Sequence, residues 1–179
     1  FTFAHFSQIG PTRIRSLLSL FSSPAEALGA SVSELLQHGI LEPLAHRIVS
    51  ERARIDATSL QRRYDQLGIR FVIPTDAEFP MLLKEIPDPP IGLFVRGTLS
   101  QETLTIAIVG TRSATGYGRL VTQELASALA AAGIIIVSGL ALGIDGVAHD
   151  AALTARGKTI AVLPCGLDRI YPVSHSGLA

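Results

Sequence analysis

The sequence predicts an α/β protein, in which a parallel sheet covered by helices follows a small all-α region. From residue 103 onward, continuous apolar strands alternate with helical segments, which is typical of parallel sheets. Residues 1–67 show helical spacing and helix-capping signals but no strand pattern. Apolar residues make up 47% of the 179 and charged residues only 17%, so the chain can bury a sizeable core.

Short helices are expected throughout residues 1–67. Arg13–Phe21 carries apolar residues at helical spacing. Ser23–Glu26 and Ser31–Glu34 each place a serine three residues before a glutamate, which predicts an N-cap and a capping box. A longer helix is predicted over Glu42–Leu67, with Gly68 as its stop.

Residues 68–102 are predicted to form a linker and an edge strand that packs on the following domain. Phe71–Ile73 is a short expected strand, and five prolines between residues 74 and 90 disfavour long regular structure. Ile91–Arg96 is the expected edge strand.

Residues 103–179 are predicted to form the first part of a doubly wound domain, with helices on both faces of its sheet. Three parallel strands make only half of such a sheet, so we expect the domain to continue beyond Ala179. The expected elements are strand 104–109, helix 117–132, strand 134–137, helix 144–155 and strand 159–163.

Composition excludes several function classes. Cys165 is the only cysteine, so an internal disulfide is excluded, and we expect no metal site and a reducing cytoplasm. The 15 basic and 15 acidic residues give no net charge, so any nucleic-acid binding has to use a local patch. No apolar run reaches the roughly 18–20 residues that cross a bilayer, so no membrane association is expected.

The first strand of the parallel sheet ends in a loop suited to an anion. Gly110 allows a sharp turn, Thr111 and Ser113 offer hydroxyls, Arg112 offers a fork of donors, and a helix start follows. The spacing is neither G-x-G-x-x-G nor a Walker A loop. The second strand ends without the acidic residue that binds the ribose of NAD, so no cofactor is expected. An ordinary βα turn is the alternative.

The second strand ends in another glycine-rich loop. Gly139 and Gly143 allow close backbone approach, and Ser138 could present its hydroxyl at the sheet edge. Asp145 and His149 lie four residues apart on the next helix. Because no nucleophile is placed to use them, we expect them to have structural roles, and no catalytic residue is predicted.

The third strand ends in the loop Pro164–Pro172, which contains Gly166 and Asp168. All three loops leave the carboxyl ends of parallel strands, so they should line one rim, where open α/β sheets bind ligands. Cys165 is expected to be a half-buried filler, and Lys158 should lie at the opposite end of the sheet.

The amino-terminal helices contain two turns of helix-hairpin-helix form. Gln8–Thr12 precedes an arginine-bearing helix, and Gln37–Leu41 lies 29 residues further on. Such a turn can offer backbone N–H groups to a DNA phosphate. A purely structural hairpin fits the sequence equally well.

Four motifs in register resemble the DprA/Smf family (DNA processing protein A). They are Ile108–Arg112 with Tyr117-Gly118, Ser138–Asp145 with Ala148-His149, Gly166–Pro172, and Asp88–Pro90 with Phe94–Gly97. The resemblance covers nearly the whole chain. It implies an extended Rossmann-like fold, preceded by a SAM-like, helix-hairpin-helix-related domain.

The resemblance further implies a bacterial cytoplasmic protein, without catalytic turnover, that binds single-stranded DNA. Such proteins protect incoming strands in natural transformation and help to load the RecA recombinase. Gly110, Thr111, Arg112 and Ser113 would form part of the strand-binding pocket, with Ser138, Gly139, Gly143 and Gly166 along its wall, while Asp168 would be structural.

The chain departs from the family pattern in the third loop. His175 stands where asparagine is usual, and Pro164-Cys165 stands where glycine is common. The later pocket residues, the surfaces for homodimer formation and RecA contact, and any winged helix would follow Ala179.

Two other functions remain open. One is a nucleotide-hydrolysing enzyme of the lysine-decarboxylase-like class, which has a similar sheet but needs a Pro-Gly-Gly-x-Gly-Thr loop that residues 1–179 lack. The other is a protein-interaction scaffold with a degenerate helix-hairpin-helix.

Overall fold

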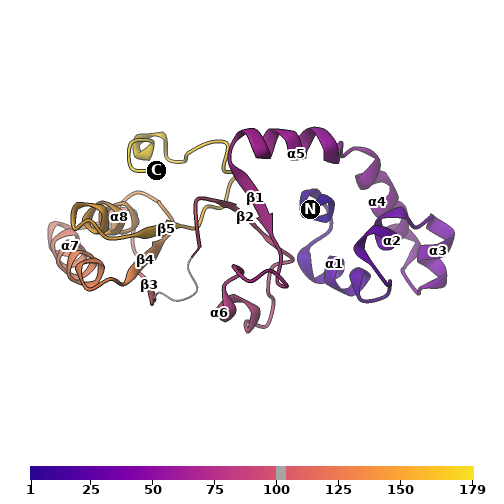
Figure 1. Ribbon diagram of the computed structural model, residues 1–179, viewed down its shortest axis with the longest axis horizontal. Coiled ribbons are helices and arrows are strands. Elements are labelled where there is room, and N and C mark those ends of the chain that lie inside the picture. The colour runs from indigo at the N-terminus through magenta and orange to yellow at the C-terminus, as the bar shows by residue number, and fades with distance from the viewer. Residues whose placement is uncertain (100–103) are drawn as a thin grey trace. The chain divides into compact units, whose positions relative to one another are not determined.

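The computed structural model describes residues 1–99 and 104–179 (Figure 1). The chain divides into two compact units, Phe1–Gln101 and Glu102–Ala179. The predicted α/β class is confirmed, because a parallel three-stranded sheet with helices follows a mainly helical region. The predicted boundary at residue 67 stays a prediction.

The first unit begins with short helices around one apolar core. Leu17, Leu35 and Ile48 are fully buried at its centre. The predicted helix starts are confirmed: the Ser23 hydroxyl accepts the Glu26 N–H, and Ser31 forms a capping box with Glu34. The helices are η1 Thr2–His5, α1 Pro11–Leu18, α2 Pro24–Gly29, α3 Val32–Gln37, α4 Glu42–Ala53 and α5 Ala57–Gln66.

The single long helix predicted over Glu42–Leu67 is wrong. The chain breaks between α4 and α5, where Asp56 starts the second helix by accepting the Ser59 N–H at 3.1 Å. Ile55, within the break, packs against the helical core. A cap and an apolar anchor together outweigh helix continuation. Gly68 follows α5 with φ of +64°, as expected for a helix stop.

A two-stranded antiparallel sheet completes the first unit. Strand β1, Ile69–Val72, pairs with β2, Leu93–Arg96, and the short helix α6, Met81–Lys84, lies between them in sequence. The prediction that Ile91–Arg96 adds an edge strand to the parallel sheet is therefore wrong. Phe71 and Phe94 are paired residues whose ring centroids lie 4.9 Å apart, so aromatic packing stabilises the observed pairing.

The second unit is the predicted βαβαβ segment. Its parallel sheet has the order β3-β4-β5, and Ile106 pairs with Ile136. The bounds are β3 Thr105–Ala107, α7 Gly116–Ala131, β4 Ile135–Ser138, α8 Ile144–Thr154, β5 Thr159–Ala161 and η2 Val173–His175.

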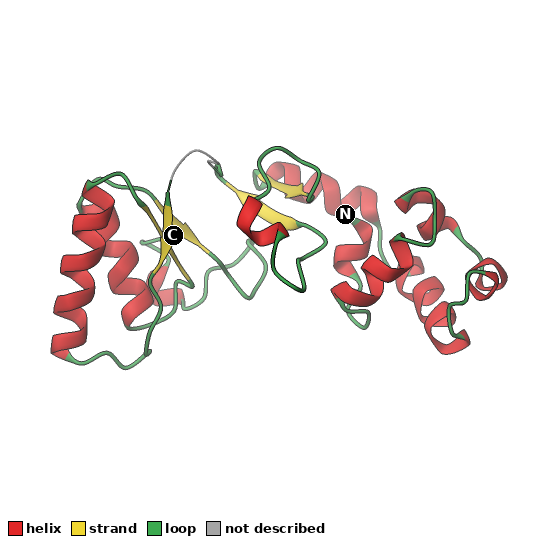
Figure 2. Ribbon diagram, turned by 90° about the horizontal axis from the view of Figure 1, so that it is seen from below, coloured by secondary structure: helices red, strands yellow, loops and turns green. Residues whose placement is uncertain are grey.

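Both long helices of the second unit lie on the same side of its sheet (Figure 2). The core between them and the sheet consists of alanines around Ile136. Because the strand order follows the chain, both right-handed crossovers place their helices on one face. The prediction of helices on both faces is therefore wrong within residues 104–179.

A buried hydrogen-bond chain ties α8 to the sheet. The Thr159 hydroxyl donates to the Ile136 carbonyl at 2.8 Å, so it accepts from Nδ1 of His149, 2.6 Å away. His149 is 1% exposed. Burial lowers the pKa of His149 below its ordinary value, and this outweighs the raising effect of the nearby Asp145 carboxylate.

In the first unit a buried carboxylate ties α4 to the amino-terminal segment. Glu51 is 5% exposed and accepts the Ser7 N–H at 2.7 Å and the Ser7 hydroxyl at 3.2 Å.

None of the helices in the described ranges combines the length and apolar composition that a membrane span requires.

Replacing Glu51 with alanine should destabilise the first unit by about 1–3 kcal/mol, because the hydrogen bonds from Ser7 to this buried carboxylate would be lost. Urea denaturation followed by circular dichroism measures the change. Glu42→Ala is the matched control, since that side chain on the same helix is 74% exposed. Equal stability of the two variants would contradict this role for Glu51.

His149 should make the second unit sensitive to acid. The pKa of His149 in the folded protein lies below the ordinary histidine value of about 6.5, so the unfolded chain takes up the proton first and acid favours unfolding. The stability that depends on neutral His149 is fully present above about pH 6.5 and is lost as the pH falls below it. The urea midpoint of His149→Gln should therefore vary less with pH than that of the unchanged protein.

The control for this measurement is His46→Gln, because His46 is a largely exposed histidine of the first unit. It should keep the original pH dependence. A His149→Gln variant with the same dependence would show that His149 does not cause it.

Candidate functional site

The first two loops of the parallel sheet meet backbone to backbone. Gly143 has φ of +80°, and a Cβ built there would lie 2.2 Å from the Thr111 carbonyl oxygen. That carbonyl accepts the Ile144 N–H at 3.1 Å, and Gly110 packs directly beneath the Ile144 side chain. Only glycine fits at position 143, and the contact places Arg112 beside the start of α8.

The polar groups of the first loop are divided between internal contacts and solvent. The Thr111 hydroxyl accepts the Ser113 N–H at 3.1 Å, so this pair shapes the loop. Thr115 caps α7 by accepting the Gly118 N–H at 3.1 Å. Arg112 is exposed and forms no ion pair with a carboxylate of the described residues.

The second loop is held closed by buried polar contacts. Ser138 is 3% exposed and donates its hydroxyl to the Ile108 carbonyl at 2.6 Å, so this hydroxyl is not presented at the sheet edge as expected. The Asp145 carboxylate accepts the Gly139 N–H at 3.1 Å. Asp145 and His149 each serve the fold, but through Gly139 and Thr159 rather than through a direct pair.

The predicted third loop, Pro164–Pro172, does not line the pocket, whereas the residues that follow it do. Gly166 packs against its neighbour Asp168, whose carboxylate lies 3.8 Å from Nε of Arg169. The chain then turns back at η2. There, Nδ1 of His175 lies 2.9 Å from the Leu140 carbonyl, and the ring packs on Gly146 of α8.

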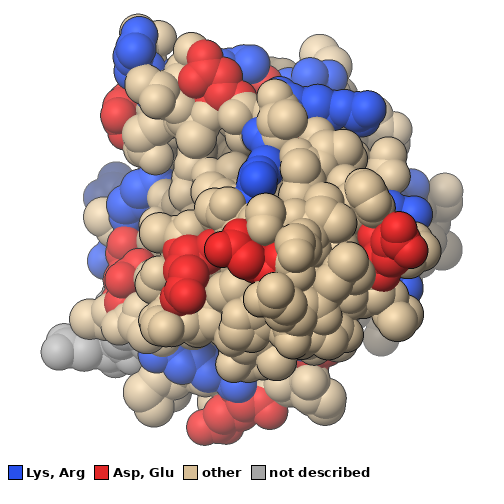
Figure 3. Space-filling view, turned by 90° about the vertical axis from the view of Figure 1, so that its right-hand side faces the viewer, with Lys and Arg blue, Asp and Glu red and all other residues tan. Residues whose placement is uncertain are grey.

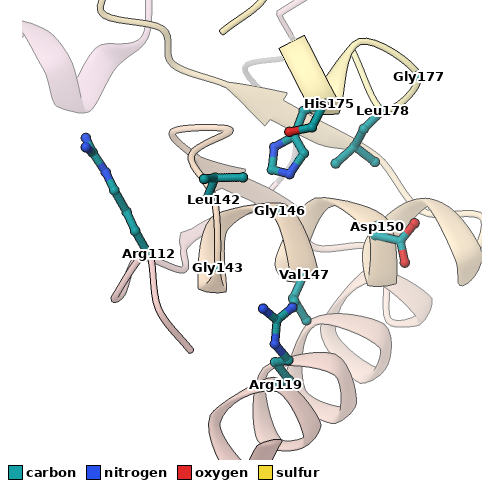
Figure 4. A pocket seen from close by; sticks show the side chains of 11 residues that line it. Arg112, Arg119, Leu142, Gly143, Gly146, Val147, Asp150, His175, Gly177 and Leu178 are labelled. Carbon is teal, nitrogen blue, oxygen red and sulfur yellow. The ribbon is translucent and has the colours of Figure 1, made fainter. Parts of the chain in front are cut away.

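A pocket of about 570 Å³ lies where these segments converge (Figure 4). One face of α8 forms its floor, α7 and the first loop supply two arginines, and the segment around η2 forms a wall. The lining residues are Arg112, Arg119, Leu142, Gly143, Gly146, Val147, Asp150, Ser174, His175, Gly177 and Leu178.

Of the predicted DNA-contacting residues, only Arg112 and Gly143 line this pocket; Gly110, Thr111, Ser113, Ser138, Gly139 and Gly166 do not. Sequence reasoning missed Arg119 and Asp150. Both carried a usable signal, because Arg119 lies in the first turn of a helix that follows a predicted anion loop. Asp150 is seven residues after Gly143 and so shares its helical face.

Lys158 lies away from this pocket, as predicted. It lines a separate pocket with Gly133 and Arg156, at the carboxyl ends of α7 and α8. This surface provides charged residues for control variants.

Two polar side chains of the first helix-hairpin-helix turn bind within the first unit. The Thr12 hydroxyl donates to Asp88 at 3.0 Å, and Arg15 pairs with the same carboxylate. Those contacts lower the pKa of Asp88, with Arg15 as the larger cause and Thr12 as the second. In the second turn, His38 packs on Phe21 with ring centroids 4.3 Å apart. These contacts favour the structural reading of both turns.

Within residues 1–99 and 104–179, no group of three or more His, Cys, Asp or Glu side chains is arranged to hold a metal ion. Cys165 is half-buried, with its sulfur 3.9 Å from the Arg169 carbonyl.

Comparison with known proteins gives a consistent result. The family model described as DNA recombination-mediator protein A matches residues 70–179. Protein Smf of Synechocystis is 36% identical over 176 residues, which are 95% of this chain and 44% of that protein. DNA processing protein DprA of Bacillus subtilis is 42% identical over 118 residues, which are 65% of this chain and 40% of that protein. The chain thus spans less than half the length of these relatives.

Solved structures agree with these matches. DNA processing protein A of Streptococcus pneumoniae aligns with a TM-score of 0.70 and 27% identity, over 95% of this chain and 63% of that chain. DNA processing protein A of Helicobacter pylori, whose structure concerns a single-stranded DNA binding mode, aligns with a TM-score of 0.53 and 39% identity, over 61% and 49%.

The family model covers more than half of the chain, and the fold agrees with that of a solved DNA processing protein A. The chain therefore belongs to the DNA recombination-mediator protein A family, the DNA-processing proteins also named DprA and Smf.

Proposed function

We propose that this chain binds single-stranded DNA, with the strand's phosphates held at the pocket between the first loop, α7 and α8. The observation that carries the proposal is the convergence of two exposed arginines, Arg112 and Arg119, on a floor that contains Gly143 and Gly146. Arginine presents a planar fork of donors to phosphate oxygens. The glycines of the floor let the first loop and the His175 ring pack close against α8, which fixes the shape of the pocket around the two arginines.

The similarity to the Helicobacter pylori protein, whose single-stranded DNA binding mode is described, supports this ligand. The neutral overall charge also favours a local site over a global field. On the face of the first unit drawn in Figure 3, basic and acidic side chains are interspersed rather than gathered into one basic field. Because Arg112 and Arg119 both belong to the second unit, we assign the phosphate contacts to that unit.

We further propose that the protein acts by binding and not by turnover. Ser174 supplies a hydroxyl to the described pocket, but it forms no hydrogen bond with Asp150 or His175, so no nucleophile is paired with a base there. Protection of incoming DNA in natural transformation, RecA loading, homodimer formation and a cytoplasmic location stay predictions that rest on the family resemblance.

Arg112→Ala and Arg119→Ala should each weaken binding of a fluorescein-labelled thymidine oligomer, measured by anisotropy at several salt concentrations. Because a lost phosphate contact releases fewer counterions, the slope of log affinity against log salt should become shallower by about 0.7 per arginine. The loss should be similar for different base sequences, since phosphates carry no sequence information.

Lys158→Ala is the charge-matched control, because it removes one positive charge from the opposite end of α7 and α8. It should leave both the affinity and the slope nearly unchanged. The proposal fails if the Arg112 variant binds as tightly as the unchanged protein, or if Lys158→Ala weakens binding equally.

A further inference from the structure

The two ends of the pocket differ in chemistry. Arg112 lies at one end, beside Gly143, and the exposed carboxylate of Asp150 lies at the other, with Gly146 between them (Figure 4). One face of α8 carries both glycines and Asp150, because Gly146 and Asp150 follow Gly143 by three and seven positions. At 1.5 Å per residue, Asp150 lies about 10 Å along the helix from Gly143.

His175 adds a second hydrogen-bond acceptor to the pocket wall. Its Nδ1 lies 2.9 Å from the Leu140 carbonyl, which can only accept, so Nδ1 carries the proton of the neutral ring. Nε2 is then an acceptor. The ring edge that carries Nε2 lies over Gly146, where a Cβ would lie 3.0 Å from Nε2 and 2.6 Å from Cε1. Arg119 lines the same pocket, but it forms no ion pair with Asp150 within 4.0 Å.

A carboxylate and the unprotonated nitrogen of an imidazole both accept hydrogen bonds. Phosphate oxygens accept hydrogen bonds too, so they find no donor here, and the carboxylate would repel their negative charge. This end of the pocket is therefore unsuited to the backbone of a strand and suited to a donor. The donors that a DNA strand offers are on its bases. The exocyclic amino group of cytosine is a recognised partner of Asp and Glu. Thymine has a carbonyl at that position, and its one pairing-edge donor, N3–H, lies between two carbonyl oxygens that a carboxylate repels.

We propose that Asp150, together with Nε2 of His175, is a specificity-determining site that accepts a hydrogen bond from the exocyclic amino group of one base. The phosphate of the same nucleotide lies toward Arg112. Strands of amino-bearing bases then bind more tightly than strands of thymine. This inference rests on the proposed single-strand binding and adds a base preference to it.

The test compares two bases that differ only at their pairing edge, thymine and 5-methylcytosine. Unlabelled oligomers of equal length, one of each base, compete with a labelled thymidine oligomer for the purified protein at neutral pH, where cytosine is uncharged. The unchanged protein should prefer the 5-methylcytosine oligomer by about fivefold, the effect of one additional hydrogen bond. In Asp150→Ala the preference should fall to nearly none, while the affinity for thymine strands is retained or rises.

Glu124→Ala is the control, because it removes an exposed carboxylate of α7 that does not line the pocket. It should keep the full preference. Equal binding of both oligomers by the unchanged protein overturns the inference, and so does an Asp150→Ala variant that binds both oligomers more tightly with the preference intact. In the second case Asp150 only opposes the phosphate charge. Failure of the unchanged protein to bind either oligomer would instead contradict single-strand binding itself.

Discussion

The close approach of two backbones at Gly143 is the constraint on which the site depends. A side chain at that position would overlap the Thr111 carbonyl, and the positive φ independently favours glycine. The Ile144 N–H donates to the same carbonyl, so the first loop and the start of α8 are fixed to one another. Arg112 is consequently positioned by α8 as well as by its own loop. The conformation of the first loop and the floor of the pocket therefore cannot vary independently.

Buried polar contacts hold the remainder of the pocket in the same way. The Asp145 carboxylate closes the second loop through Gly139, and His149 joins α8 to the sheet through Thr159. Leu140 adopts a φ of +57°, and its carbonyl accepts from His175, which brings the carboxyl-terminal segment against Gly146. The residues that resemble a catalytic pair in sequence thus maintain the shape of the rim. Side chains with little role in the fold, Arg112, Arg119 and Asp150, are the ones left exposed to a ligand.

Much of this arrangement could be predicted from sequence, because the relevant signals are local. The capping box at Ser31, the glycine stop at Gly68 and the apolar strands of the βαβαβ segment each depend on a few consecutive residues. The partner of β2 could not be predicted, since the Phe71–Phe94 contact joins residues more than 20 positions apart. For the same reason the sequence did not reveal that the Ser138 hydroxyl donates to the Ile108 carbonyl, or that His175 packs against α8. Helix spacing could have added Asp150 to the candidate site. That the segment around η2 folds back onto α8 could be learned only from the structure.

The most direct test of this account is a nuclear magnetic resonance titration of the ¹⁵N-labelled protein with a short single-stranded oligomer. The account predicts that the amide signals of Gly143, Gly146 and Gly177, which line the arginine-flanked pocket, shift progressively as the oligomer is added. The amides of Gly133 and Gly157, at the opposite end of α7 and α8, should stay in place. Shifts confined to Gly133 and Gly157, or to the helices of the first unit, would contradict the assignment of this pocket as the site of strand binding.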